Sequence, residues 1–174
     1  NNFNGLAVFN GKLYFGAEGN NGSGTELWVY DGVNAPSMVA DIWSGSDDSF
    51  PRNLAVFNSK LYFSADNGLG TTGNELWVYD GVNPPSLAAD VTSGAGSSYP
   101  SFMTAFGANL YFSADGGDGA GYELWKYDGT NAPSRVADIL SGPEGSYPLH
   151  MTVFNSKLYF QASNVGGQDY ELWV

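Results

Sequence analysis

The sequence predicts an all-β protein made of about four antiparallel sheets, each with four short strands. The first observation is a repeat, because the block LAVFNGKLYF at Leu6 returns in varied form at Leu54, Met103 and Met151. The successive steps are 48, 49 and 48 residues. The second is that these blocks are rich in aromatic and branched residues and are separated by Gly, Asn, Asp and Pro, as strands are by turns. The third is that no ten-residue segment has helical periodicity.

The second repeat shows the expected strands in order, beginning with a hairpin. Residues 54–57 form the first expected strand and residues 61–65 the second. Between them lies Asn58-Ser59, whose counterpart in the first repeat is Asn10-Gly11, the strongest short signal for a two-residue hairpin turn. We therefore expect the two strands to pair antiparallel.

The other two expected strands follow a glycine-rich connection. Residues 66–74 carry the chain to a third strand at 75–79, after which Asp80-Gly81 turns it again. The fourth strand is expected at 86–91, and a Ser/Gly/Pro loop over 92–101 leads into the next repeat.

Four short strands in a unit of this length are typical of a β-propeller blade. The motifs Leu61-Tyr62-Phe63 and Leu76-Trp77-Val78-Tyr79 show no polar–apolar alternation, so both faces of the sheet must be covered. Blades that stack face to face provide this cover. We expect a single propeller domain or segment, with blades at residues 6–42, 54–91 and 103–139 and a partial fourth at 151–174.

The fourth repeat stops after its third strand, at Val174, so its outer strand is missing. Three explanations are open: a fragment of a longer propeller, pairing with another copy in a larger ring, or a four-bladed ring with one three-stranded blade. We favour continuation of the chain or self-association, because an uncovered strand at residues 171–174 is an edge that invites pairing.

The repeats also resemble a known family over essentially the full chain. The second repeated block, Glu26-Leu27-Trp28, returns at Glu75, Glu123 and Glu171. Together with Leu-Tyr-Phe-x-Ala, Asp-Gly and an Asp-Ile ending, it resembles the bacterial β-propeller repeat family with Glu-Leu-Trp-x-x-Asp-Gly blades. Only Asp128-Gly129-Thr130 carries that family's threonine. The resemblance implies a propeller, and a weaker similarity to lectin propellers rests on blade length and aromatic content.

Composition and charge exclude several function classes. Six Lys and Arg against 18 Asp and Glu give a net charge of −12, which repels nucleic acid and anionic membrane surfaces. The apolar runs are far shorter than the roughly 18 residues of a membrane span. Hydrophobic content of 43% argues against disorder, and the absence of cysteine argues against a disulfide scaffold. An extracellular or cell-surface protein fits this acidic balance.

Most of the acidic residues that recur at the same position in successive repeats have a structural interpretation. An aspartate that precedes a turn glycine accepts hydrogen bonds from turn amides, and one that precedes a Ser-Gly turn braces it. The alternative is that these carboxylates bind Ca²⁺, and the loop with Asp115 and Asp118 most resembles a calcium loop. The structural positions are Asp31, Asp80 and Asp128 before glycine, and Asp41, Asp90 and Asp138 before the later turn.

The aromatic residues divide into core and loop positions. Trp28, Trp77, Trp125 and Trp173 recur in the third strand and are expected to pack between blades. Phe50, Tyr99 and Tyr147 each lie between serine and proline in the inter-blade loops, where they either plug the junction or form platforms for sugar rings. Trp43, Asp47 and Asp48, which lie in the first of these loops, complete the candidate ligand-binding set.

Catalysis has little support in the sequence. His150 is the single histidine, no cysteine is present, and no serine lies in a Gly-x-Ser-x-Gly turn. The acidic residues repeat, whereas a catalytic carboxylate pair is usually unique. We therefore expect a non-catalytic extracellular binding propeller whose partners are glycans or surface ligands. The alternative is a self-assembly module of a larger surface protein or filament, stabilised by Ca²⁺.

Overall fold

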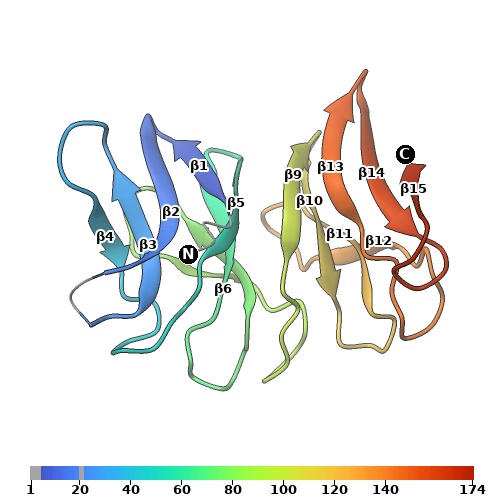
Figure 1. Cartoon of the computed structure of the whole chain (residues 1–174), viewed down its shortest axis with the longest axis horizontal. Helices are drawn as coiled ribbons and strands as arrows, with labels where there is room; N and C mark the ends of the chain where they lie inside the picture. Colours follow the sequence, from blue (N-terminus) through green and yellow to red (C-terminus); the bar gives the residue numbers. More distant parts are fainter. Residues whose placement is uncertain (1–4, 20–21) are drawn as a thin grey trace.

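The structure, a computed structural model, describes residues 5–19 and 22–174, which form fifteen strands in four antiparallel sheets (Figure 1). The first sheet contains β1 (Leu6–Phe9), β2 (Lys12–Glu18), β3 (Thr25–Tyr30) and β4 (Ser37–Ala40). The second contains β5 (Arg52–Phe57), β6 (Lys60–Ala65), β7 (Glu75–Tyr79) and β8 (Ser86–Ala89). The third contains β9 (Ser101–Phe106), β10 (Asn109–Asp115), β11 (Tyr122–Tyr127) and β12 (Ser134–Ala137). The last contains β13 (Leu149–Phe154), β14 (Lys157–Ser163) and β15 (Tyr170–Trp173).

Each sheet is a meander in which strand order follows chain order. Neighbouring strands are antiparallel throughout, and the fourth sheet has three strands. The predicted all-β architecture of four-stranded, propeller-like blades is confirmed, including the shortened last blade. In the described part of the chain, no helix could span a membrane.

The predicted hairpin turns have the geometry that favours Asn-Gly. In the second blade both turn residues have positive φ angles, 46° at Asn58 and 56° at Ser59. The first blade has 48° at Asn10 and 71° at Gly11. Two successive positive φ angles define the turn whose twist matches that of paired strands. Serine occupies the second position at a conformational cost that glycine avoids.

The first strands of the second, third and fourth blades begin two residues earlier than their motifs predict. In β5 the pairing with β6 shifts register between Arg52 and Ala55, and Asn53 has a φ of 55°. Phe102 and His150 occupy the same position in β9 and β13, with φ angles of 52°. Such a bulge continues the strand but breaks the regular order of side chains by which sequence locates its start.

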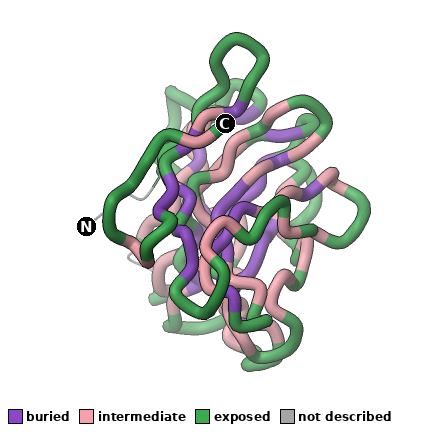
Figure 2. The backbone as a smooth tube through the Cα atoms, turned by 90° about the vertical axis from the view of Figure 1, so that its right-hand side faces the viewer, coloured by how far each residue is buried: buried purple, intermediate pink, exposed green. Residues whose placement is uncertain are grey.

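The core lies between successive blades. Phe9, Tyr14 and Leu27 of the first blade pack against the second blade, in a cluster completed by Leu61, Phe63, Ala65 and Trp77. An equivalent cluster joins the second and third blades, and a third joins the third and fourth. Most buried residues belong to strands. In Figure 2 the buried stretches lie in the interior of the molecule, whereas most outer loops are exposed. Blade stacking therefore covers both faces of the second and third sheets, as the missing alternation predicted.

Stacking brings the first strand of each blade beside the first strand of the next blade. The first strands β1, β5, β9 and β13 lie next to each other in this order, so they form the inner row of the array. The loops that join one blade to the next then lie at blade junctions, where residues from two sheets meet. These junctions hold most of the candidate site residues.

Candidate functional site at the blade junctions

Phe50, Tyr99 and Tyr147 have the same conformation at three successive junctions. Their φ angles are 48°, 45° and 48°, in a region that bulky residues rarely occupy. Their amides donate hydrogen bonds to the carbonyls of Thr25, Asn74 and Tyr122, each just before or at the start of a third strand. Their exposed fractions are 41%, 54% and 38%. The backbone thus holds three aromatic side chains partly in solvent.

The residues on either side of these aromatics are buried. The serine before each aromatic has no exposed surface, and the proline after each is also buried. Serine and proline therefore fill the junction, and the ring between them reaches its surface. The serines are Ser49, Ser98 and Ser146, and the prolines are Pro51, Pro100 and Pro148.

A fully buried glutamate anchors each of these serines. In the second blade the Glu75 carboxylate accepts hydrogen bonds from the Ser98 hydroxyl at 2.5 Å, the Ser98 amide at 2.8 Å and the Val91 amide at 2.8 Å. Burial raises the pKa of Glu75 to about 7, while its bonds with Ser98 and Val91 act in the opposite direction. Burial also raises the pKa of Glu26, its counterpart. Each glutamate joins a blade to the loop that follows it.

Three tyrosines around the third blade form a group that we call the tyrosine cluster: Tyr99 in the loop before this blade, Tyr122 at the start of β11, and Tyr147 in the loop after it. The rings of Tyr122 and Tyr147 stack with centroids 5.4 Å apart and planes at 20°. Burial, followed by the nearby Asp115 charge and the Tyr99 and Tyr147 phenols, raises the pKa of Tyr122. Tyr122 thus links the loop aromatics of two successive junctions.

Sequence reasoning missed Tyr122. Its counterparts are Thr25, Asn74 and Tyr170, so the residue type at this position is not kept in all four repeats. The only sequence signal was a tyrosine directly before the Glu-Leu-Trp block in two repeats.

Phe50 has a different neighbour. The Arg52 guanidinium lies 4.7 Å from the centroid of the Phe50 ring, within the range of a cation–π interaction. One face of this aromatic is therefore covered by Arg52, the first residue of β5, which distinguishes the first junction from the third.

Trp43 packs over the backbone of the next blade. A Cβ atom at Gly68 would lie 1.9 Å from the Trp43 ring, so the indole occupies the space that a side chain there would need. At the next junction, the Thr92 side chain occupies the space that a Cβ atom at Gly117 would need. Trp43 therefore fills part of the first junction.

Asp47 and Asp48 lie beside each other but differ in their contacts. Asp48 Oδ1 accepts a hydrogen bond from the Thr25 amide at 2.5 Å, and the Ser97 hydroxyl does the same for the Asn74 amide one junction later. The Asp47 side chain is exposed. Asp48 thus fixes the start of β3.

The aspartates that recur before the turn glycines accept hydrogen bonds from turn amides. Asp31 Oδ1 accepts hydrogen bonds from the Val33 and Asn34 amides, and its Oδ2 accepts one from the Asn34 side chain. These bonds, led by the Asn34 side chain, lower the pKa of Asp31 to about 2. Asp80 and Asp128 have equivalent bonds and lowered pKa values. Asp41 and Asp90 accept from Gly45 and Gly94, and nothing comparable is found at Asp138.

The candidate calcium residues lie in one loop but have other partners. Asp115 Oδ1 accepts from the Gly117 amide, and Asp118 forms a 3.1 Å ion pair with Arg135. Within residues 5–19 and 22–174, no three His, Cys, Asp or Glu side chains are grouped as metal ligands.

His150, on the inner strand β13, contacts an aromatic ring. Its imidazole lies edge-on to Phe102, with centroids 5.3 Å apart and planes at 68°. Both residues occupy the bulge position of their strands. This contact joins the inner strands of the third and fourth blades.

Comparison with solved structures shows the same fold in two larger proteins. A Bacteroides ovatus protein described as xyloglucan PUL GH43B has 16% identity and a TM-score of 0.53, over 95% of this chain and 39% of that chain. The AtxE2 isopeptidase in its apo form has 12% identity and a TM-score of 0.52, over 90% of this chain and 24% of that chain. The chain thus spans well under half the length of either protein.

No protein-family model matches the chain, and no curated protein matches its sequence. The resemblance to the Glu-Leu-Trp repeat family therefore rests on the repeated motifs alone. At 16% and 12% identity, the structural similarity shows a shared fold alone.

Proposed function

We propose that the chain is a non-catalytic, extracellular binding module whose blade junctions bind carbohydrate, with the tyrosine cluster as the principal site. The observation that carries this proposal is the repeated Ser-aromatic-Pro step. Its serine and proline are buried, and its aromatic is held at a positive φ with the ring partly in solvent. Backbone strain of this kind is a feature of ligand-binding sites in many proteins.

The chemistry of the tyrosine cluster suits a sugar ring. A phenol ring offers a flat apolar face that stacks on the C–H face of a sugar, and its hydroxyl can bond with sugar hydroxyls. The half-buried Asp115 beside Tyr122 adds an acceptor at the rim. A site with apolar walls and a few polar groups is typical of small-ligand recognition.

Repetition favours binding over catalysis. A ligand that contacts two or three junctions at once gains affinity through effective concentration, although each contact is weak. The three buried glutamates, by contrast, bind loop amides and serine hydroxyls within the protein. An exposed acidic surface with a net charge of −12 suits a neutral ligand such as a glycan better than a polyanion.

The test is a glycan array followed by calorimetric titration of any ligand found. Xyloglucan oligosaccharides belong among the probes, because one similar structure is named for a xyloglucan PUL. We expect Tyr99→Ala and Tyr147→Ala each to weaken binding about tenfold, the usual scale for loss of one aromatic platform.

Val82→Ala is the matched control. Val82 is 85% exposed and follows the Asp80-Gly81 turn, at the opposite end of the sheet from the junction loops. This variant should bind as the parent does. If no glycan binds at millimolar concentration, or if both tyrosine variants bind normally, the proposal is wrong.

A further inference from the structure

The outward faces of the first and fourth blades expose residues whose counterparts are buried at the first two blade interfaces. Each of the two middle blades has a leading face, which packs on the preceding blade, and a trailing face, which packs on the following blade. The leading face of the first blade and the trailing face of the fourth have no neighbouring blade in the described chain. Both consist of the same residue types that form the inter-blade core.

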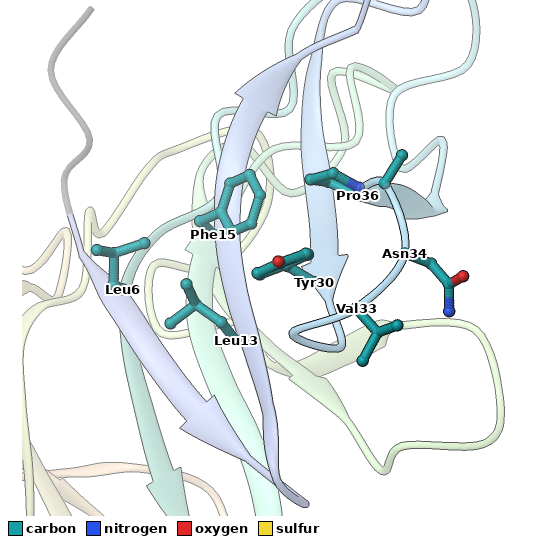
Figure 3. A pocket seen from close by; sticks show the side chains of 8 residues that line it. Leu6, Leu13, Phe15, Tyr30, Val33, Asn34 and Pro36 are labelled. Atoms are coloured by element: carbon teal, nitrogen blue, oxygen red, sulfur yellow. The ribbon is translucent and has the colours of Figure 1, made fainter.

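The leading face of the first blade contains Leu6, Leu13, Phe15 and Tyr30. The counterparts of Leu13 and Phe15 in the next two blades, Leu61, Phe63, Leu110 and Phe112, are fully buried. In the first blade, however, Leu13 and Phe15 are only half-buried. Together with Leu6, which is 59% exposed, and Tyr30, they line an open hollow of about 590 Å³. Figure 3 shows their side chains along the hollow, together with Val33, Asn34 and Pro36 of the turn after β3.

The trailing face of the fourth blade contains Phe154, Tyr159 and Leu172. Phe154 is 61% exposed and Leu172 is 73% exposed. Their counterparts in the first blade, Phe9 and Leu27, are 3% and 0% exposed, and those in the second blade are equally buried. The fourth blade thus exposes a core face that has the same composition as the buried ones.

A group of three aromatic rings shows how the two faces fit. At the first interface Phe9 and Tyr14 have centroids 5.8 Å apart, and Tyr79 of the following blade lies 6.4 Å and 5.8 Å from them. At the second interface Tyr127 lies 6.0 Å from Tyr62, which pairs with Phe57 at 5.9 Å. At both of these interfaces the third ring comes from the leading face of the next blade. At the third interface Phe106 and Tyr111 form the same kind of pair, with centroids 6.1 Å apart.

The fourth blade already holds two of the three rings. Phe154 and Tyr159 have centroids 6.2 Å apart and planes at 53°, close to the 54° of Phe9 and Tyr14. The counterpart of Tyr79 and Tyr127 on the leading face of the first blade is Tyr30, which lines the hollow.

The space around the turn glycines is consistent with this arrangement of three rings. A Cβ atom at Gly81 would lie 3.3 Å from the Phe9 ring and 3.0 Å from Asn10, whereas one at the counterpart Gly32 would have nothing within 4 Å. The first blade therefore has the space that Phe154 would fill.

We propose that the trailing face of the fourth blade packs on the leading face of the first blade in a second copy of this chain. The contact reproduces the register of the inter-blade interfaces within one chain, with Tyr30 of one copy beside Phe154 and Tyr159 of the other. It is head-to-tail, because the two surfaces differ. Two copies supply eight blades, which lies within the range of closed propellers.

The test measures the mass of the purified chain in solution by size-exclusion chromatography with light scattering. We expect at least twice the 18.5 kDa of one chain. Tyr30→Asp and Phe154→Asp each place a charge in the contact, and each should weaken self-association at least a hundredfold. Leu6→Asp is a second variant of the leading face, and Val82→Asp is the control that should still assemble. Circular dichroism checks that every variant folds.

Mixing distinguishes this contact from other ways of associating. The Tyr30→Asp chain keeps an intact trailing face, and the Phe154→Asp chain keeps an intact leading face. A mixture should therefore form a dimer that grows no further, although each variant alone is monomeric. A monomeric parent overturns the proposal, as does a Phe154→Asp chain that still self-associates. Glycan binding by the monomeric variants is a separate result, since neither residue belongs to the tyrosine cluster.

Discussion

Glu75 makes the stability of this protein depend on pH between about 4.5 and 7. The carboxyl group is fully buried, and burial raises its pKa from 4.5 to about 7. A raised pKa means that the fold favours the protonated form. The resulting stabilisation is complete below pH 4.5 and is lost as the pH rises through about 7. At about 1.4 kcal/mol for each pH unit, the loss is about 3 kcal/mol.

The assay compares the parent with Glu75→Gln by urea unfolding at pH 4.5 and pH 8. Glutamine has nearly the same shape but does not titrate, so the variant lacks this contribution at either pH. We expect the free energy of unfolding of the parent, relative to that of the variant, to fall by about 3 kcal/mol between the two pH values. Glu26 titrates in both proteins, and its contribution cancels in the comparison.

Glu18→Gln is the control, because Glu18 is exposed at the end of β2. Its pH dependence should match that of the parent. If the parent and Glu75→Gln lose the same stability between the two pH values, Glu75 does not titrate as a buried acid. Burial would then not raise the pKa of Glu75 in the folded protein.

Two further predictions concern local geometry. Ser59→Gly should raise the free energy of unfolding by about 0.5–1 kcal/mol, because Ser59 has a φ of 56° and glycine adopts this conformation without strain. Urea unfolding measures it, and an unchanged midpoint would contradict it. Gly68→Ala should destabilise the fold by about 1–3 kcal/mol more than Gly70→Ala, which has a similar φ but open space around it. Equal midpoints for the two variants would show that Trp43 does not pack on Gly68 as described.

Local sequence was sufficient for the elements of this fold. Strand identity and hairpin geometry depend on a few adjacent residues, so the Leu-Tyr-Phe block and Asn58-Ser59 predicted both. Stacking was also predictable, since a strand that is apolar on both faces needs cover on both. The bulge at Asn53 was not predictable, because a single residue in the left-handed region leaves no periodic signal.

The candidate site depended on contacts between segments far apart in the chain. The sequence identified Ser-aromatic-Pro as a repeated step but left platform and plug as alternatives. Ser98 donates a hydrogen bond to the buried Glu75, 23 residues earlier in the chain, and this contact shows that the serine fills the junction. Tyr122 joins Tyr147 only because a third strand and the next loop meet there.

By itself, the sequence determined that this chain repeats a four-stranded antiparallel unit and that the units stack. These properties follow from residue type and spacing, which act locally along the backbone. Only the tertiary structure decided which copies of a repeated residue are buried. Leu27 and Leu172 occupy equivalent positions, yet one has no exposed surface and the other is 73% exposed. Burial depends on whether a neighbouring blade packs on that face, and repetition of a motif does not record which faces are covered.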